Sequence, residues 1–169
     1  MPGRHLDWIR QQAQARGFTH LHTGRLMRPA AARNFGARHV KTEYIAFVEN
    51  DVVFRQGWLE SLVNCADLTK AAAVTPLTCE GRPIHTKVHH VGEELRNEEL
   101  FEGRPAGERD FHEGFIHKNQ QVEEVDDRLS RRRTESAELH CVLVRRSVLE
   151  QIGYFDPVIV SKEYLDFSW

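Results

Sequence analysis

Hydrophobic positions along the first half of the chain switch between helical and strand-like spacing. Apolar residues at helical intervals predict helices over residues 5–16, 29–40 and 56–68, and short apolar runs predict strands over 18–22, 44–48 and 71–75. Gly17 ends the first helix, and Pro29 suits the first turn of the second. Because helices and strands alternate, this pattern predicts an α/β sheet with parallel members.

The pattern changes over residues 79–133, which are rich in charge, histidine and glycine. Here we expect strands over 84–91 and 121–125, joined by long loops. Regular spacing returns with a strand predicted over 139–144, a helix over 146–152, a turn over 155–157 and a helix beginning near Ser161. The arginines of residues 128–133 are expected to face solvent rather than to clamp a phosphate.

Composition narrows the possible function classes. The chain has 169 residues, a formal net charge of −2 and three cysteines without paired spacing. We expect one domain over residues 1–169, no nucleic-acid partner, no transmembrane segment and a reducing, cytoplasmic location, with a peripheral position at a membrane left open.

The strand predicted over residues 44–48 ends in two carboxylates, Glu49 and Asp51. Ligands in open α/β sheets bind beyond the carboxyl ends of strands, and hard cations such as Mg²⁺ or Mn²⁺ prefer carboxylate and phosphate oxygens. This pattern predicts a divalent-metal site able to hold a diphosphate. The alternative is that both acids are ordinary loop residues, with Asp51 capping a turn.

Four segments, in order, resemble the family 2 glycosyltransferases, which are inverting enzymes with the GT-A fold. Residues 32–38 resemble the family's Arg-Asn-x-Gly helix, and residues 44–52 with 57–59 resemble its Asp-x-Asp strand and the helix start behind it. Residues 140–146 with 152–156 resemble the strand, helix and turn before the catalytic acid, and residues 163–167 resemble the acidic motif itself. The resemblance implies a GT-A-type Rossmann-like mixed sheet flanked by helices.

The chain departs from the family pattern at several points. Glu49 stands where the family has aspartate, and Tyr164 stands where many relatives carry a second acid. The family begins with a strand and loop that hold the nucleotide base, whereas this chain opens almost directly in the following helix. We therefore expect a partial domain that lacks the usual first strand and the usual C-terminal end.

The resemblance also implies a mechanism: transfer of a sugar from a nucleotide diphosphate sugar to an acceptor hydroxyl, with inversion and with Mn²⁺ or Mg²⁺. Asp51 would bind the cation, and Glu49 would bind the cation, its waters or the ribose of the donor. Glu163 is the first candidate for the catalytic base and Asp166 the second. The alternative for Glu163 is a helix N-terminal acid that favours the helix dipole.

Other candidate site residues have structural alternatives. His140 is predicted to complete the metal shell or contact the diphosphate, and otherwise to serve as a structural hydrogen-bonding group. Arg33 and Asn34 are expected near the donor, although for Asn34 we favour hydrogen bonds to the backbone within the fold. The histidines at 85, 89 and 90 show no ligand spacing, and we expect them at the surface.

These observations favour a glycosyltransferase of polysaccharide or glycoconjugate synthesis, acting on a glycan, a lipid-linked molecule or a protein. One alternative is a degenerate, non-catalytic GT-A-like domain that serves as a binding or scaffold module. Another is a nucleotidyltransferase, which would need a glycine-rich phosphate loop near the start; the sequence has none. A sheet without its first strand would expose an edge, which would either be covered by self-association into a homo-oligomer or leave the protein unstable.

Overall fold

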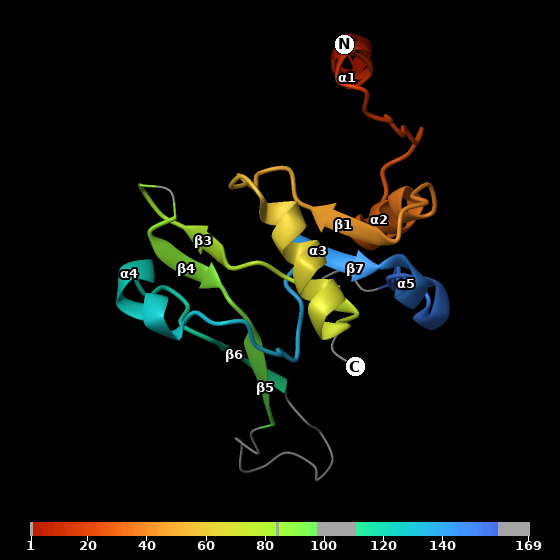
Figure 1. The fold of residues 1–169 in the computed structure, drawn as a ribbon. Helices are drawn as coiled ribbons and strands as arrows, with labels where there is room; N and C mark the ends of the chain where they lie inside the picture. The colour runs from red at the N-terminus through yellow and green to blue at the C-terminus, as the bar shows by residue number, and fades with distance from the viewer. Residues whose placement is uncertain (1, 84, 98–110, 159–169) are drawn as a thin grey trace, which may run out of the picture.

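The computed structural model describes residues 2–83, 85–97 and 111–158. Its elements are α1 (Pro2–Ala15), α2 (Pro29–Ala37), β1 (Tyr44–Val48), α3 (Trp58–Thr69), β2 (Ala73–Val74), β3 (Thr78–Glu80), β4 (Lys87–His90), β5 (Glu93–Asn97), β6 (Phe111–Phe115), α4 (Val122–Val125), the 3-10 helix η1 (Asp126–Arg128), β7 (Cys141–Arg145) and α5 (Arg146–Ile152). Figure 1 shows small sheets flanked by helices, so the predicted α/β class is confirmed. The helix predicted near Ser161 lies outside the described residues.

A three-stranded sheet in the order β1–β7–β2 forms the centre of the fold. β7 is antiparallel to both neighbours, with Tyr44 opposite Arg145 and Val48 opposite Cys141 in the first pair. β1 and β2 therefore run in the same direction, as expected for strands joined by a helix, but β7 lies between them. The β3–β4 and β5–β6 pairs are antiparallel as well, so every hydrogen-bonded strand pair within the described residues is antiparallel.

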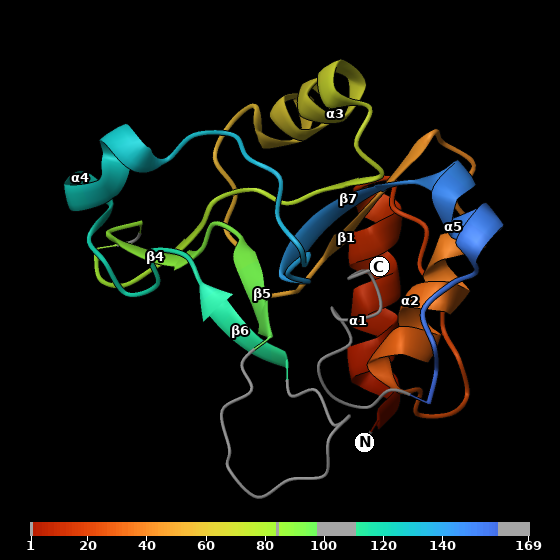
Figure 2. The same cartoon turned by 90° about the horizontal axis from the view of Figure 1, so that it is seen from below.

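Helices cover both faces of the central sheet (Figure 2). On one face, Ile45 and Phe47 of β1 and alternate residues of β7 pack with α2 and α5. On the other face, the remaining apolar residues of β7 pack with Leu62 and Ala66 of α3. Because both of its faces are covered, the first four residues of β7 are all buried, and this is why its sequence is a continuous apolar run.

The network around Arg145 fixes the end of β7 that is remote from the acidic end of β1. Its guanidinium donates hydrogen bonds to the Glu43 carboxylate (2.9 Å), the Ala66 carbonyl (3.0 Å) and the Asp67 carboxylate (3.4 Å), and lies 4.8 Å from the centre of the Tyr44 ring. The Tyr44 hydroxyl donates to Asp67 at 2.5 Å. Partial burial and this hydrogen bond raise the pKa of Tyr44 to about 12, and the same hydrogen bond lowers the pKa of Asp67.

The N-terminal segment follows the prediction only in part. The first helix is confirmed as α1, and Gly17 after it has φ +71°, a left-handed conformation that suits glycine. α1 lies apart from the central sheet in Figure 1. The strand predicted over 18–22 is wrong: the segment is irregular, with Phe18 68% exposed, and no described strand lies beside it to pair with.

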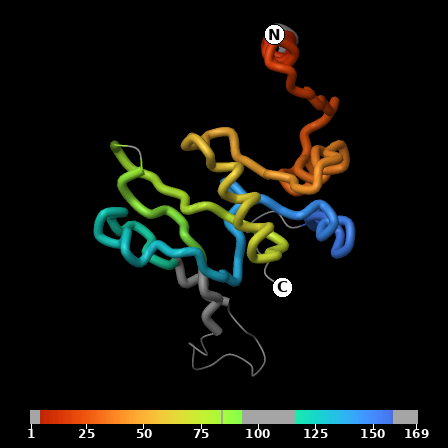
Figure 3. Tube along the Cα trace, in the orientation of Figure 1, coloured from red at the N-terminus to blue at the C-terminus, as the bar shows by residue number. Residues whose placement is uncertain are grey.

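The β3–β4 hairpin and α4 lie to one side of the central sheet (Figure 3). A second two-stranded sheet is formed by β5 and β6. The strand predicted over 84–91 is confirmed as β4, whereas the strand predicted over 121–125 is wrong and forms helix α4. Glu123 and Glu124 lie in the first turn of α4, where acids favour the helix dipole. The arginines of residues 128–133 are exposed, as expected. None of the helices described is both long enough and apolar enough to cross a membrane.

Candidate functional site

The acidic end of β1 lies beside the beginning of β7. Val48 is opposite Cys141, and the backbone N–H of Glu49 donates to the carbonyl of His140 at 3.0 Å. The strand pairing therefore brings two segments that are about 90 residues apart in sequence to one edge of the sheet. Glu49 and His140, both predicted from sequence as site residues, are neighbours there through their backbones.

The side chain of Glu49 forms an ion pair with Arg33 of α2. The guanidinium Nη2 lies 3.2 Å from Oε1 of Glu49; the Arg33 side chain is mostly buried, while that of Glu49 is 42% exposed. The pair holds the carboxylate in place and offsets its charge. It leaves the second carboxylate oxygen for a hydroxyl or a cation-bound water, because a carboxylate has acceptor sites for several partners.

Asp51 is exposed, three residues beyond the end of β1. Within the described part of the chain its carboxylate makes no hydrogen bond or ion pair. No hydrogen bond within the described residues therefore supports the alternative that Asp51 caps a turn. Its carboxylate oxygens are accessible to a cation.

Asn34 is buried and joins α2 to the segment that follows α5. Its Nδ2 donates to the carbonyl of Phe155 at 2.7 Å, and its Oδ1 accepts from the N–H of Phe155 at 3.0 Å. The structural alternative favoured for Asn34 is thus confirmed, because both polar atoms of the amide bond to one backbone residue. Contact of Asn34 with a donor remains a prediction.

The two candidate bases, Glu163 and Asp166, lie outside the described residues. The turn that precedes them is described: the Val158 N–H donates to Oδ1 of Asp156 at 2.8 Å, which confirms the turn predicted over 155–157. The buried Phe155 ring packs edge-on against Phe47 of β1, with ring centres 5.1 Å apart. These contacts hold Phe155 in the core and shape the turn that follows it.

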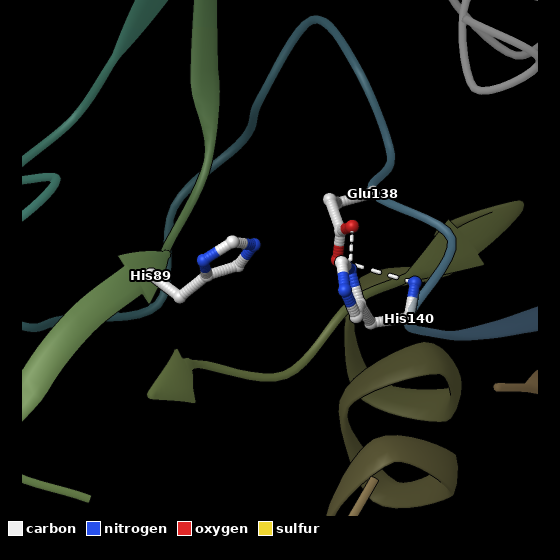
Figure 4. A group of neighbouring side chains, drawn as sticks. All are labelled: His89, Glu138 and His140. Carbon is white, nitrogen blue, oxygen red and sulfur yellow. Dashed lines mark hydrogen bonds and ion pairs between the residues drawn. The ribbon is translucent and has the colours of Figure 1, made fainter. Parts of the chain in front are cut away.

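The ring of His140 lies with Glu138 and His89 (Figure 4). One ligand atom from each of these three residues lies within 4.8 Å of the others; Glu49 and Asp51 belong to no comparable group within the described residues. The sequence interpretation missed Glu138 and His89, and placed His89 at the surface, whereas it is half-buried. The available signal was the closeness of Glu138 and His140 in sequence just before a buried strand; both lie in the segment that enters β7.

His90, also expected at the surface, is buried instead. It follows His89 on β4, so the two side chains point to opposite faces of the strand. Burial lowers the pKa of His90 to about 4, so the ring is neutral at physiological pH.

Comparison of the sequence with known proteins identifies a family. A profile of the family described as Glycosyl transferase family 2 matches residues 6–153. Two curated relatives, from Mycobacterium tuberculosis strains CDC 1551 / Oshkosh and ATCC 25618 / H37Rv, are both named pre-mycofactocin glycosyltransferase. Each is 31% identical over 141 residues, which cover 83% of this chain and 26% of the relative. No solved structure matches the chain.

The matched span extends from α1 to the end of α5 and includes Arg33, the acidic end of β1 and the beginning of β7. The chain spans about a quarter of the length of the two relatives. Since the family profile covers most of the 169 residues, the chain belongs to glycosyl transferase family 2.

Proposed function

We propose that the chain transfers a sugar from a nucleotide diphosphate sugar to an acceptor hydroxyl, with inversion and with a divalent cation. The observation that carries the proposal is the acidic end of β1 in a family 2 glycosyltransferase chain, with Arg33 paired to Glu49 and Asp51 accessible to a ligand. These groups lie where ligands of α/β sheets bind, beyond the end of a strand.

The donor set suits a hard cation. Asp51 and Glu49 supply carboxylate oxygens, the ligand type preferred by Mg²⁺ and Mn²⁺, and phosphate oxygens of the donor would complete such a shell. When bound there, the cation would offset the charge that develops on the leaving diphosphate. His140, predicted from sequence as a further ligand, lies at the same edge of the sheet and contacts Glu49 through its backbone, but its side chain lies with His89 and Glu138 instead.

Each protein group has a separate task in this mechanism. Asp51 would hold the cation, and Glu49, held by Arg33, would bind the cation, its waters or the donor's ribose. Glu163, or Asp166 in its place, takes the proton of the acceptor hydroxyl as that oxygen attacks the anomeric carbon. A glycan, a lipid-linked molecule or a protein carries the acceptor hydroxyl, and pre-mycofactocin is one acceptor to test because the relatives bear that name.

Calorimetric titration of UDP into the purified chain, with and without Mn²⁺, tests the proposal. We expect binding that requires Mn²⁺, that is abolished in Asp51→Ala and that is retained in Asp127→Ala, a matched control at an exposed aspartate. Unchanged affinity in Asp51→Ala would refute the assignment of Asp51. Absence of binding by a folded protein, repeated with the other common nucleoside diphosphates, would refute donor binding by this chain.

A further inference from the structure

We propose that His89, Glu138 and His140 form a binding site for a divalent transition-metal ion such as Zn²⁺, separate from the cation of the donor site. The inference does not depend on the proposed glycosyl transfer. His89 comes from β4, and Glu138 and His140 come from the segment that enters β7, so the three side chains converge from two parts of the chain (Figure 4).

The spacing of these groups is close to that of a metal shell. Their ligand atoms lie within 4.8 Å of one another. Zinc bonds of about 2.0–2.1 Å in tetrahedral geometry place ligand atoms about 3.4 Å apart, so closure of the site needs movements of at most about 1.4 Å. Side-chain rotation supplies such a movement, because all three residues are only partly buried.

The chemistry of the set differs from that of the β1 acids. Two imidazoles and one carboxylate suit zinc and the neighbouring first-row metals, whereas Mg²⁺ and Ca²⁺ prefer sites made of oxygen alone. Three protein ligands of the His, His and Glu type hold zinc with one coordination position left open for water or a substrate group. The set therefore predicts preference for Zn²⁺ or Co²⁺ over Mg²⁺.

The surroundings hold the ligands in orientation. Nδ1 of His89 lies 3.3 Å from Oε2 of Glu80 on β3, which leaves Nε2 to face the site, and in Figure 4 the His89 ring points toward Glu138 and His140. Carboxylates that contact the second nitrogen of a histidine in this way are typical around metal ligands. His140 is fixed through its backbone: its carbonyl accepts from Glu49, and its N–H donates to Oε2 of Glu138 at 3.2 Å.

His140 contacts both of the other residues. Nδ1 of His140 contacts Oε1 of Glu138, and the rings of His89 and His140 lie edge to face with centres 4.9 Å apart. An ion would replace these contacts by bonds that link the β3–β4 hairpin to the beginning of β7. It would thus fix the hairpin against the edge of the central sheet that carries Glu49.

Titration of Co²⁺ into the full chain, first freed of metal by a chelator and with no nucleotide present, tests the site. Co²⁺ is chosen because Zn²⁺ has a filled d shell and no visible spectrum. We expect a saturable visible band at one Co²⁺ per chain, displaced by Zn²⁺, which binds nitrogen and oxygen ligands more tightly. Affinity should fall at least tenfold in His89→Ala, His140→Ala and the nearly isosteric Glu138→Gln, and should stay unchanged in His22→Ala and Asp51→Ala.

Two further measurements keep the test decisive. In nuclear magnetic resonance spectra of the wild-type chain, Zn²⁺ should shift the ring signals of His89 and His140 and leave those of His22 in place. Zn²⁺ should also raise the thermal unfolding midpoint of the wild type but not of Glu138→Gln, because an ion that binds only the folded site stabilises it. A folded wild type with no saturable band, equal loss in His22→Ala, or loss in Asp51→Ala but not in Glu138→Gln would each overturn the proposal.

Discussion

Replacement of Asn34 by alanine removes the two hydrogen bonds that join α2 to the segment after α5. Both bonds go to the backbone of Phe155, at 2.7 and 3.0 Å, and both residues are buried. Water cannot readily replace these bonds, because the site is closed from solvent. The substitution therefore tests whether Asn34 acts as a connection within the core.

The magnitude follows from the two bonds. Loss of a buried hydrogen-bond partner costs about 1–2 kcal/mol for each bond, so Asn34→Ala should lower the free energy of unfolding by about 2–4 kcal/mol. With a urea m-value of about 2 kcal/mol per molar, the unfolding midpoint should fall by about 1–2 M. Asn34→Asp should be at least as damaging, because it places a carboxylate oxygen against the Phe155 carbonyl and buries a charge.

Urea unfolding followed by circular dichroism measures these changes. Asn64→Ala on the exposed face of α3 is the matched control and should change stability by no more than about 0.5 kcal/mol. A loss below about 1 kcal/mol in Asn34→Ala, with two-state unfolding, would refute the structural role. Loss of nucleotide binding in that variant at unchanged stability would instead place Asn34 at the donor.

Three further outcomes are expected. Leu149→Ala in the core should cost about 2–5 kcal/mol in urea unfolding, and Ile152→Ala, at an exposed position of the same helix, much less; equal costs would contradict the described packing. Because folding lowers the pKa of Asp67, this carboxylate stabilises the fold at pH values above its ordinary pKa of 3.8, and the contribution is lost as the pH falls through the pKa of the folded state. In Tyr44→Phe, the free energy of unfolding should therefore depend less on pH in the acid range. An unchanged pH dependence would exclude the Tyr44 hydrogen bond as the cause of the shift. Arg33→Ala should weaken Mn²⁺-dependent UDP binding in calorimetry of the folded variant, and unaltered binding would argue against a role beside Glu49.

The sequence predicted the central elements well because their signals are local. The apolar run of β1, the helical spacing of α2 and α3, and the α5 segment with Gly153 after it all appear where expected, with small shifts at the ends. The strand predicted over 18–22 failed because strand formation needs a partner, which periodicity within one segment does not reveal. The segment over 121–125 failed because two adjacent acids suit a helix start better than a half-buried strand.

The candidate site was only partly predictable for a related reason. The acids after β1 could be found from the pattern along the chain, and hydrogen bonding of Asn34 to the backbone was favoured from the chemistry of an amide. Its partner, Phe155, is 121 residues away and could not be named from sequence. The meeting of His89 with Glu138 and His140 depends on how the β3–β4 hairpin lies against the beginning of β7. Contacts between segments about 50 residues apart depend on tertiary packing, which a histidine spacing on one strand cannot show.

The position of β7 between β1 and β2 has a consequence for folding during synthesis. β1 ends at Val48, and its partner begins at Cys141, so 92 residues are made between the two. At about 5–20 residues per second, the ribosome takes about 5–20 s to make them. During that interval β1 and β2 lack their shared partner, and their unpaired backbone groups are open to other chains. Among the described strands, β7 is therefore made last and closes the sheet, and nascent chains that end before it should depend most on chaperones.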